Sequence, residues 1–230
     1  MGNRKLKKEI LGLLGKSDFQ KALEAIRQIP GRKAANPLFS LLYHADALIR
    51  WHAVSAMGVV VSRLADEDLE SARIVMRRLL WNLNDESGGI GWGSPEAMGD
   101  IMARHSQLAD EFSKILRSYI MPQGNFLEHP MLQRGVLWGL ARLAGTRPAH
   151  VAAAGPFLSG FLLSADPVHR GFSILIIRAI GHKRSLSLLE TMMKDPTVIE
   201  VYEDLMLKPV SVGRLASRTI DSFILYDLSE

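Results

Sequence analysis

Apolar residues recur along most of the chain every three or four positions, which is the period of one face of an α-helix. No stretch alternates polar and apolar residues in the manner of half-buried strands. Pro and Gly separate the periodic segments and predict short connections between antiparallel neighbours. We therefore expect helices over about 17–29, 47–61, 69–83, 107–120, 131–144, 149–163, 167–180, 185–194, 197–206 and 211–225. Two more helices are expected to start at Pro37 and at Ser94.

Several helix starts carry local signals. Ser17-Asp-Phe-Gln20 fits a capping box, with Ser17 as the N-cap. Pro30-Gly31 is expected to end that helix, and Pro37 to open the next one. Ser94-Pro95-Glu96 combines an N-cap Ser, Pro at the first helical position and an acid in the first turn.

Two pairs of segments repeat within the chain. Ile, Trp, Ala, Met and Gly of segment 49–58 recur in register in segment 90–99, 41 residues later. Arg134-Gly-Val-Leu-Trp-Gly-Leu-Ala-Arg142 likewise overlays Arg170-Gly-Phe-Ser-Ile-Leu-Ile-Ile-Arg178 at an offset of 36 residues. Such periods, with paired helices, are typical of helical repeats in which neighbours supply each other's core.

On these motifs the chain resembles HEAT-like repeat proteins, including the subtype named after phycobilisome-lyase repeats, which segment 166–196 fits best. Segment 80–100 also resembles an uncharacterised bacterial HEAT-like family. The resemblance implies an all-α fold, a right-handed α-α superhelix of armadillo type with about five to six helix pairs. We expect one domain over 1–230, with N-terminal capping helices over 1–35, repeats over 36–206 and a C-terminal cap over 207–230.

The composition removes several functional classes. The 230 residues include no Cys, so disulfides, thiolate metal sites and thiol nucleophiles are absent. The seven His are scattered without metal-ligand spacing, and we expect neither metal nor cofactor. No apolar run reaches the length of a membrane span, and no leader is apparent, so we expect a cytoplasmic protein without membrane attachment. The basic N-terminal segment fits a capping helix or, alternatively, an interfacial amphipathic helix.

Charge is distributed in bands. Residues 1–34 hold nine Lys and Arg against three acids, and 65–111 hold four against ten. Residues 112–184 return to nine against two, and 185–230 to four against eight. A protein that binds nucleic acid over its whole surface would carry excess positive charge along the whole chain, unlike these alternating bands. The bands therefore indicate either solvated faces or a partner of mixed charge.

The Gly-rich segment 84–94 is the strongest candidate for a functional site. A structural turn is one interpretation, closed by packing of Trp81 and Trp92. A partner pocket is the other, with Trp92 as an aromatic anchor and Asp85 and Glu86 as partners for a basic group. An anion site at the helix start near Ser94 is opposed by those two acids. The spacing matches neither a P-loop nor a dinucleotide fingerprint.

A set of Arg residues is predicted to lie on the second helices of successive repeats. Arg50 and Arg170 each have an Asp four residues earlier, which suggests an Asp–Arg ladder between repeats. Arg134 lacks such an Asp and is therefore expected to be free for a ligand. We take Arg134 and Arg170 as candidate contacts for an acidic group of a partner.

A second resemblance points to an enzyme. HEAT-like alkylpurine DNA glycosylases share a Pro and a Gly-Asp-Ile, here Pro95 and 99–101, and a Leu-Gln-Arg helix whose Arg contacts DNA, here ending at Arg134. The position of that family's catalytic carboxylate falls on Gly91, so the general base is missing. The sequence therefore favours non-enzymatic binding of a protein or peptide, through the inner face and the 84–94 loop. A DNA-repair glycosylase that binds nucleic acid is the alternative.

Overall fold

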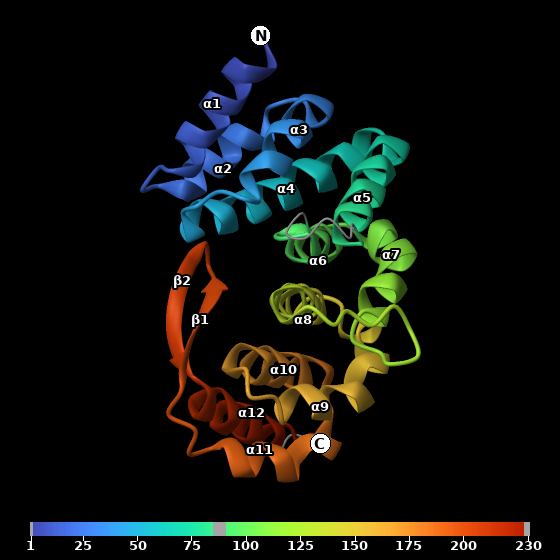
Figure 1. Ribbon diagram of the computed structural model, residues 1–230, viewed down its shortest axis with the longest axis vertical. Coiled ribbons are helices and arrows are strands. Elements are labelled where there is room, and N and C mark those ends of the chain that lie inside the picture. Colours follow the sequence, from blue (N-terminus) through green and yellow to red (C-terminus); the bar gives the residue numbers. More distant parts are fainter. Residues whose placement is uncertain (1, 85–90, 228–230) are drawn as a thin grey trace. The chain divides into compact units, whose positions relative to one another are not determined.

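The computed structural model describes residues 2–84 and 91–227, which form twelve α-helices, three short 3-10 helices and one two-stranded sheet (Figure 1). The chain divides into two compact units, which are described separately. Unit 1 comprises residues 1–112 with 204–206, and unit 2 comprises 113–203 with 207–230. The expected arrangement of one domain with caps at 1–35 and 207–230 stays a prediction.

Unit 1 is built around one long helix. Its elements are α1 (Asn3–Leu14), α2 (Phe19–Arg27), α3 (Gly31–Leu41), α4 (Ala47–Glu67), α5 (Leu69–Leu83), α6 (Ser94–Arg104) and the first part of α7 (Ser106–Ser118). Helix α4 packs against α2, α3, α5 and α6. Every residue from His52 to Val61 is buried, as expected for a helix that is covered on all sides.

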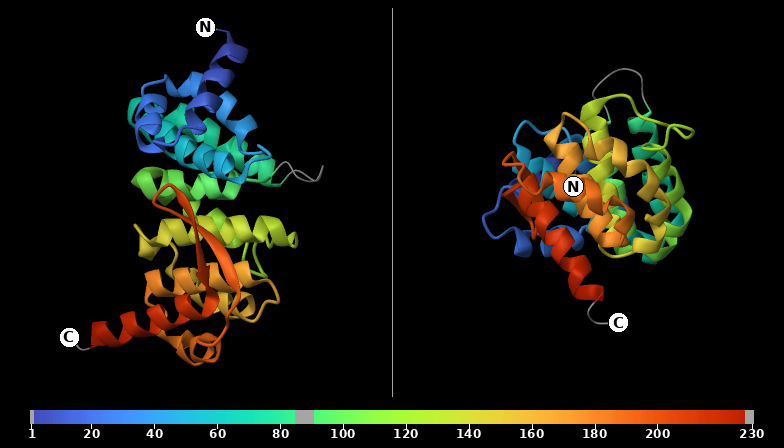
Figure 2. Two further views of the ribbon diagram at one scale, coloured as in Figure 1. Left: turned by 90° about the vertical axis from the view of Figure 1, so that its left-hand side faces the viewer. Right: turned by 90° about the horizontal axis from the view of Figure 1, so that it is seen from below.

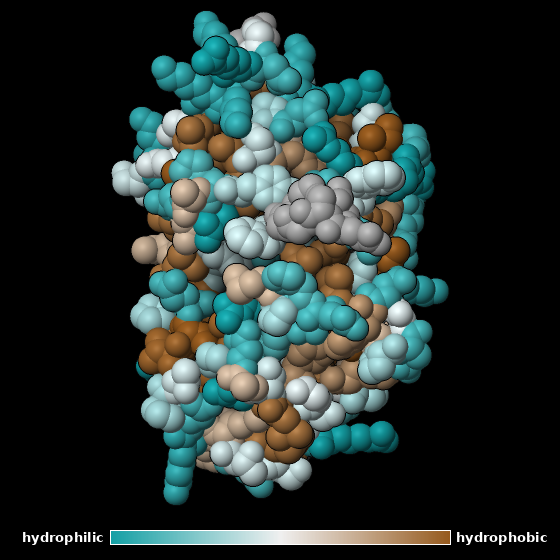
Figure 3. All heavy atoms as spheres, in the orientation of Figure 1, coloured by the Kyte–Doolittle hydropathy of each residue, from teal (hydrophilic) through white to brown (hydrophobic). Residues whose placement is uncertain are grey.

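The N-terminal helix α1 fits a capping helix. Its apolar residues Leu6, Ile10 and Leu14 are buried, and the helix packs against α2 and α3. The side chains at the N-terminal end of unit 1 are mostly hydrophilic in Figure 3. The apolar face of α1 is thus covered by α2 and α3. The role of this helix as a cap stays a prediction.

Several helix boundaries differ from the sequence prediction. Asp18, not Ser17, caps α2, since its Oδ1 accepts a hydrogen bond from the Lys21 N–H at 3.2 Å. Helix α3 begins at Gly31, so Pro30 precedes the helix and Pro37 lies within it. The ring of Pro37 is buried, and packing compensates for the backbone donor that proline lacks. The prediction that Pro37 opens a helix was therefore wrong.

The repeated Ala-Met-Gly triplets, 56–58 on α4 and 97–99 on α6, are all buried in unit 1. A Cβ placed on Gly58 would collide with the Asp100 carboxylate of α6. Asp100 is itself buried and accepts a hydrogen bond from the Arg104 Nε at 2.8 Å. Gly58 is therefore required for the close approach of α4 and α6.

Unit 2 is centred on α10. Its elements after α7 are α8 (Pro130–Ala144), η1 (Pro148–His150), η2 (Ala152–Phe157), α9 (Leu158–Leu162), α10 (Pro167–Ile180), η3 (Lys183–Ser185), α11 (Leu186–Met192), β1 (Val198–Glu203), β2 (Met206–Ser211) and α12 (Val212–Asp227). Helix α10 packs against α8, α9, α12 and β1. The predicted helix 149–163 is split into 3-10 turns and α9, since Pro156 interrupts the regular hydrogen bonds.

The C-terminal region contains the largest error of the sequence prediction. Residues 197–206 were expected to be helical, but β1 and β2 form an antiparallel hairpin (Figure 2). The two turn residues, Asp204 and Leu205, have φ of 51° and 62°, as a type I′ turn requires. The alternative signal was present in the β-branched residues of 197–201, which favour strands.

Trp138 of α8 belongs to the buried core of unit 2. Its side chain is 5% exposed, and its ring centroid lies 6.2 Å from that of Tyr202 in β1. After the hairpin, α12 follows the predicted helix 211–225 closely. The C-terminal half of α12 extends beyond the other helices of unit 2 (Figure 2), and Ile224 and Leu225 on it are exposed.

Candidate functional site

A glycine turn starts α6 in unit 1. Gly93 has a φ of 75°, and its carbonyl accepts the first helical hydrogen bond, from the Ala97 N–H at 2.9 Å. A Cβ on Gly93 would lie 2.9 Å from the Cβ of Leu42. Glycine is thus required both by the left-handed backbone and by the contact with Leu42. Gly93, and not the predicted Ser94, is the N-cap, and the turn places Trp92 immediately before it.

Three aromatic side chains near this turn are exposed. Trp92 is 45% exposed, and Trp81, near the end of α5, is 74% exposed. Tyr43 follows α3 and is 36% exposed; its phenol oxygen accepts a hydrogen bond from the Asn82 side-chain amide at 3.2 Å. The prediction that Trp81 packs to close the loop was therefore wrong, since this side chain faces solvent near the end of α5.

Glu96 is the third residue of α6, and its carboxyl group reaches back over the helix start. Burial raises the pKa of Glu96 to about 7, although the backbone N–H groups of Glu96 and Gly93 and the charge of Arg50 act in the opposite direction. The bond to the Gly93 N–H is half of a capping box. The Oε2 atom is buried without a hydrogen-bond partner among the described residues. The structure thus holds an unsatisfied acceptor near the exposed aromatic residues.

Arg50, on α4, holds the preceding turn of the backbone. Its Nη1 donates to the carbonyl oxygens of His44 at 2.8 Å and Ala45 at 3.0 Å. Arg170 binds the carbonyls of its own preceding turn in the same way, but it also binds a carboxylate with its other nitrogens. Within residues 2–84 and 91–227, no carboxylate forms a hydrogen bond with the remaining nitrogens of Arg50.

In unit 2 the predicted site residues Arg134 and Arg170 belong to a ladder of ion pairs. The Arg134 Nε donates to the Asp166 Oδ2 at 2.6 Å, and the Arg170 Nε and Nη2 donate to the Asp195 Oδ2 at 3.1 and 2.8 Å. The other oxygen of Asp166 caps α10 through the Val168 N–H at 2.9 Å. The prediction that Arg134 is free was wrong, because its Asp lies in the following repeat and not four residues earlier.

The ladder also sets the ionisation of its carboxylates. Burial acts to raise the pKa of Asp166, but the hydrogen bonds from Arg134 and Val168 outweigh it and hold the pKa below its ordinary value. The pKa of Asp195 is lowered against burial in the same way, by Thr197 and Arg170. Both carboxylates are therefore charged at neutral pH, and each neutralises one Arg.

Of the predicted site residues, the structure describes Trp92, Arg134 and Arg170, and it separates Trp92 in unit 1 from the two Arg in unit 2. Asp85 and Glu86 lie outside the described residues. Sequence reasoning missed Glu96, Arg50 and Tyr43 as parts of the site. The electrostatic effect of Arg50 on Glu96 cannot be inferred from spacing, since the two residues are 46 positions apart in the sequence.

No cluster of three or more His, Asp or Glu suited to a metal ion occurs in the described ranges. None of the helices, as far as the chain is described, has the length and apolar character needed to cross a membrane.

Comparisons with known proteins show the fold. No family model matches the chain. Over 75 residues it is 33% identical to an uncharacterized protein of Archaeoglobus fulgidus, and this match spans 33% of the chain and 38% of the relative. Among solved structures, an engineered protein is similar with a TM-score of 0.54 at 14% identity, covering 97% of both chains.

A designed armadillo repeat protein, solved in complex with the peptide (KR)4, is similar with a TM-score of 0.52 at 16% identity, covering 95% of this chain and 99% of that one. The chain thus has a mostly helical armadillo/HEAT-like repeat fold, as the sequence predicted. The finer resemblance to phycobilisome-lyase repeats stays a prediction.

Proposed function

We propose that this protein is a non-enzymatic binding protein that holds a peptide segment of a protein partner at the start of α6. The observation that carries the proposal is the exposure of Trp92, immediately before the residue Gly93 that starts α6, together with the exposure of Trp81 near the end of α5. Exposed Trp side chains on a rigid support are typical of the residues that dominate binding energy at protein interfaces. Arg50 adds donors for a backbone carbonyl of the peptide.

We further propose that the peptide is basic. Residues 65–111 hold ten acids against four Lys and Arg, and both exposed Trp lie in this band. Indole faces attract Lys and Arg side chains, and Asp85 and Glu86 are the expected carboxylate partners. The similar designed armadillo protein was solved with a peptide of alternating Lys and Arg, which supports the same class of ligand.

The remaining predicted contacts stay predictions. To bind an acidic group of a partner, Arg134 would have to leave Asp166, and Arg170 would have to leave Asp195. Each change breaks a partly buried ion pair, which is unfavourable. We therefore assign the first contact to Trp92. The cytoplasmic location is likewise a proposal from composition.

A glycosylase is the second candidate, and one observation favours it. A carboxyl group with a pKa of about 7, as Glu96 has, suits a general base at neutral pH. Against it, the position of the family's catalytic carboxylate is Gly91, and the Oε2 of Glu96 is buried.

Fluorescence anisotropy separates these candidates. We expect labelled (Lys-Arg)4 to bind, an acidic (Glu-Asp)4 peptide not to bind, and Trp92→Ala to weaken the binding of the basic peptide at least ten-fold. Leu225→Ala, which removes an exposed apolar side chain of α12, is the matched control and should leave the affinity unchanged. Equal affinities of wild type and Trp92→Ala would reject the surface. Tight, steeply salt-dependent binding of duplex DNA, with release of an alkylated base that Glu96→Gln abolishes, would establish the enzyme instead.

A further inference from the structure

Unit 2 has a cavity that is open to solvent and has no part in the proposed peptide surface of unit 1. Its volume is about 690 Å³, which lies within the range of small-molecule binding sites. The lining comes from the segment after α7, from α8, and from the region of η2, α9 and α10.

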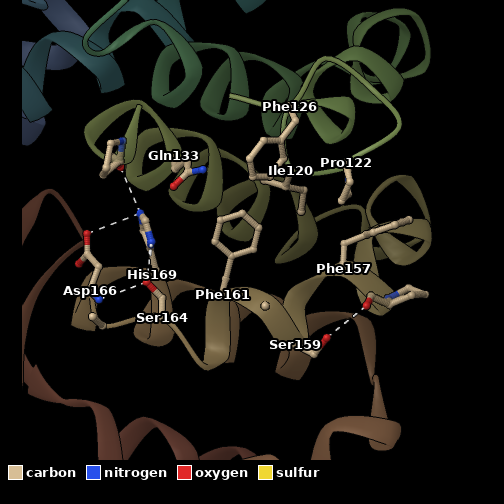
Figure 4. Close-up of a pocket in the computed structure, with 14 residues that line it drawn as sticks. Ile120, Pro122, Phe126, Gln133, Phe157, Ser159, Phe161, Ser164, Asp166 and His169 are labelled. Carbon is tan, nitrogen blue, oxygen red and sulfur yellow. Dashed lines mark hydrogen bonds and ion pairs between the residues drawn. The ribbon is translucent and has the colours of Figure 1, made fainter. Parts of the chain in front are cut away.

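One end of the cavity is aromatic. Phe126, Phe157 and Phe161 line it together with Ile120 and two prolines (Figure 4). Phe161 is fixed from the side by an edge-on contact with His169, with ring centroids 5.6 Å apart and planes at 83°. Phe126 is 41% exposed, so its ring is available to an entering molecule. Such walls favour a planar aromatic guest, which can stack on or meet the edges of these rings.

The other end presents hydrogen-bond acceptors. Gln133 is nine-tenths buried, and its Nε2 donates to the Leu127 carbonyl at 2.5 Å. Its Oε1 accepts no hydrogen bond from the described residues. His169 is held by Ser164 and the Pro130 carbonyl, both at 3.1 Å, so its ring nitrogens are already engaged (Figure 4). The acceptor left for a guest is therefore the amide oxygen of Gln133.

The charges of the lining residues restrict the kind of molecule that the cavity can bind. The lining contains one carboxylate, Asp166, which its lowered pKa keeps ionised, and it contains no Lys or Arg. A carboxylate or phosphate would therefore lack a cationic partner among the lining residues, since the nearby Arg134 is already paired with Asp166. We propose that this cavity binds an uncharged small molecule that has an aromatic ring and one hydrogen-bond donor. The Oε1 atom of Gln133 accepts the hydrogen bond from that donor.

A glycine in the wall allows a direct test. A Cβ on Gly160 of α9 would meet no atom within 4 Å, so a larger side chain there can enter the cavity without displacing the backbone. Gly12 of α1 has equally open surroundings in unit 1 and provides the matched control. We expect Gly160→Leu to place its side chain in the cavity, whereas Gly12→Leu adds the same side chain to a helix elsewhere.

The experiment measures binding of indole to the full chain by titration calorimetry, with Kd on the order of 1 mM expected for so small a probe. Gly160→Leu should weaken binding at least ten-fold, with an unchanged circular dichroism spectrum, and Gly12→Leu should not. 1-Methylindole, which lacks the donor, and indole-3-carboxylate, which is charged, should each bind several-fold more weakly than indole.

Three results would overturn the proposal: no indole binding at millimolar concentrations, equal binding by Gly160→Leu, or equal affinity for 1-methylindole. If N-acetyl-tryptophanamide binds much more tightly than indole, the natural guest is a peptide side chain, and the small-molecule assignment is wrong. Since Trp92→Ala leaves this cavity intact, loss of peptide binding in that variant with retained indole binding would separate the two sites.

Discussion

The buried carboxyl group of Glu96 makes unit 1 sensitive to pH. Its folded-state pKa of about 7 lies above the ordinary value of 4.5 because burial disfavours the charged form. Between these two values the folded chain retains a proton that the unfolded chain has lost. Stability from this group is therefore greatest below pH 4.5 and falls as the pH rises toward 7. Glu96→Gln should remove this dependence, since the amide stays neutral.

The size of the effect follows from the two pKa values. With about 1.36 kcal/mol for each pKa unit, wild type should lose about 2–3 kcal/mol of unfolding free energy between pH 5 and pH 8 relative to Glu96→Gln. The amide also keeps an oxygen that can accept the Gly93 N–H, so the helix cap is preserved. At pH 5 the two proteins should have similar stability, because the wild-type side chain is then also neutral.

The assay is urea unfolding followed by Trp fluorescence at pH 5, 6, 7 and 8. Three of the four Trp, at positions 51, 81 and 92, lie in unit 1, so the signal reports mainly on the unit that holds Glu96. Glu9→Gln, at an exposed position of α1, controls for the loss of one carboxylate. If the difference between wild type and Glu96→Gln stays constant from pH 5 to pH 8, the assignment of a raised pKa to Glu96 is refuted.

Two further predictions concern the contacts that position the helices. Asp166→Ala removes both the cap of α10 and the partner of Arg134, and should lower unfolding free energy by about 2–4 kcal/mol at pH 7 in chemical denaturation. Because the pKa of Asp166 is lowered, this contribution should fade below about pH 4, and a constant loss down to pH 2 would contradict it. Gly58→Ala should lower the free energy of unfolding by about 1–3 kcal/mol, because its Cβ would clash with Asp100. Gly12→Ala, whose Cβ meets no other atom, should stabilise α1 slightly. Equal melting temperatures of these two variants would contradict the close approach of α4 and α6.

Hydrophobic periodicity was sufficient to predict most of the helices. Helix α5 matches its predicted range at both ends, and α10 spans the predicted residues 167–180. These helices have clear apolar faces and terminal signals, such as the Asp68 side chain that caps α5 through the Ser71 N–H. The fold class followed from the repeated segments, because each repeat contains one packing unit.

Local sequence failed where tertiary contacts decide the conformation. The hairpin of β1 and β2 was read as a helix because Val, Ile and Leu there also fit a helical period. Its buried side is completed by contacts far away in the sequence, such as Tyr202 against Trp138. Sequence patterns do not contain that information.

Only part of the candidate site could be predicted, because the rest depends on contacts between residues far apart in the sequence. The Gly-rich segment and the exposed Trp92 could be found from composition, since glycine and a lone Trp between helices stand out. The pairing of Arg134 with Asp166 required knowledge of which helices are neighbours. The burial of Glu96 depended likewise on the packing around the start of α6, although Pro95 had already marked the helix start.

The central claim is that a basic peptide lies on the exposed Trp side chains at the start of α6. The four indole N–H signals of the 15N-labelled protein, assigned with single Trp→Phe variants, test it within one titration with (Lys-Arg)4. We predict that the signals of Trp81 and Trp92 shift and saturate together, while that of the buried Trp138 stays in place. A titration in which Trp81 and Trp92 do not respond, or in which Trp138 alone responds, would contradict the claim.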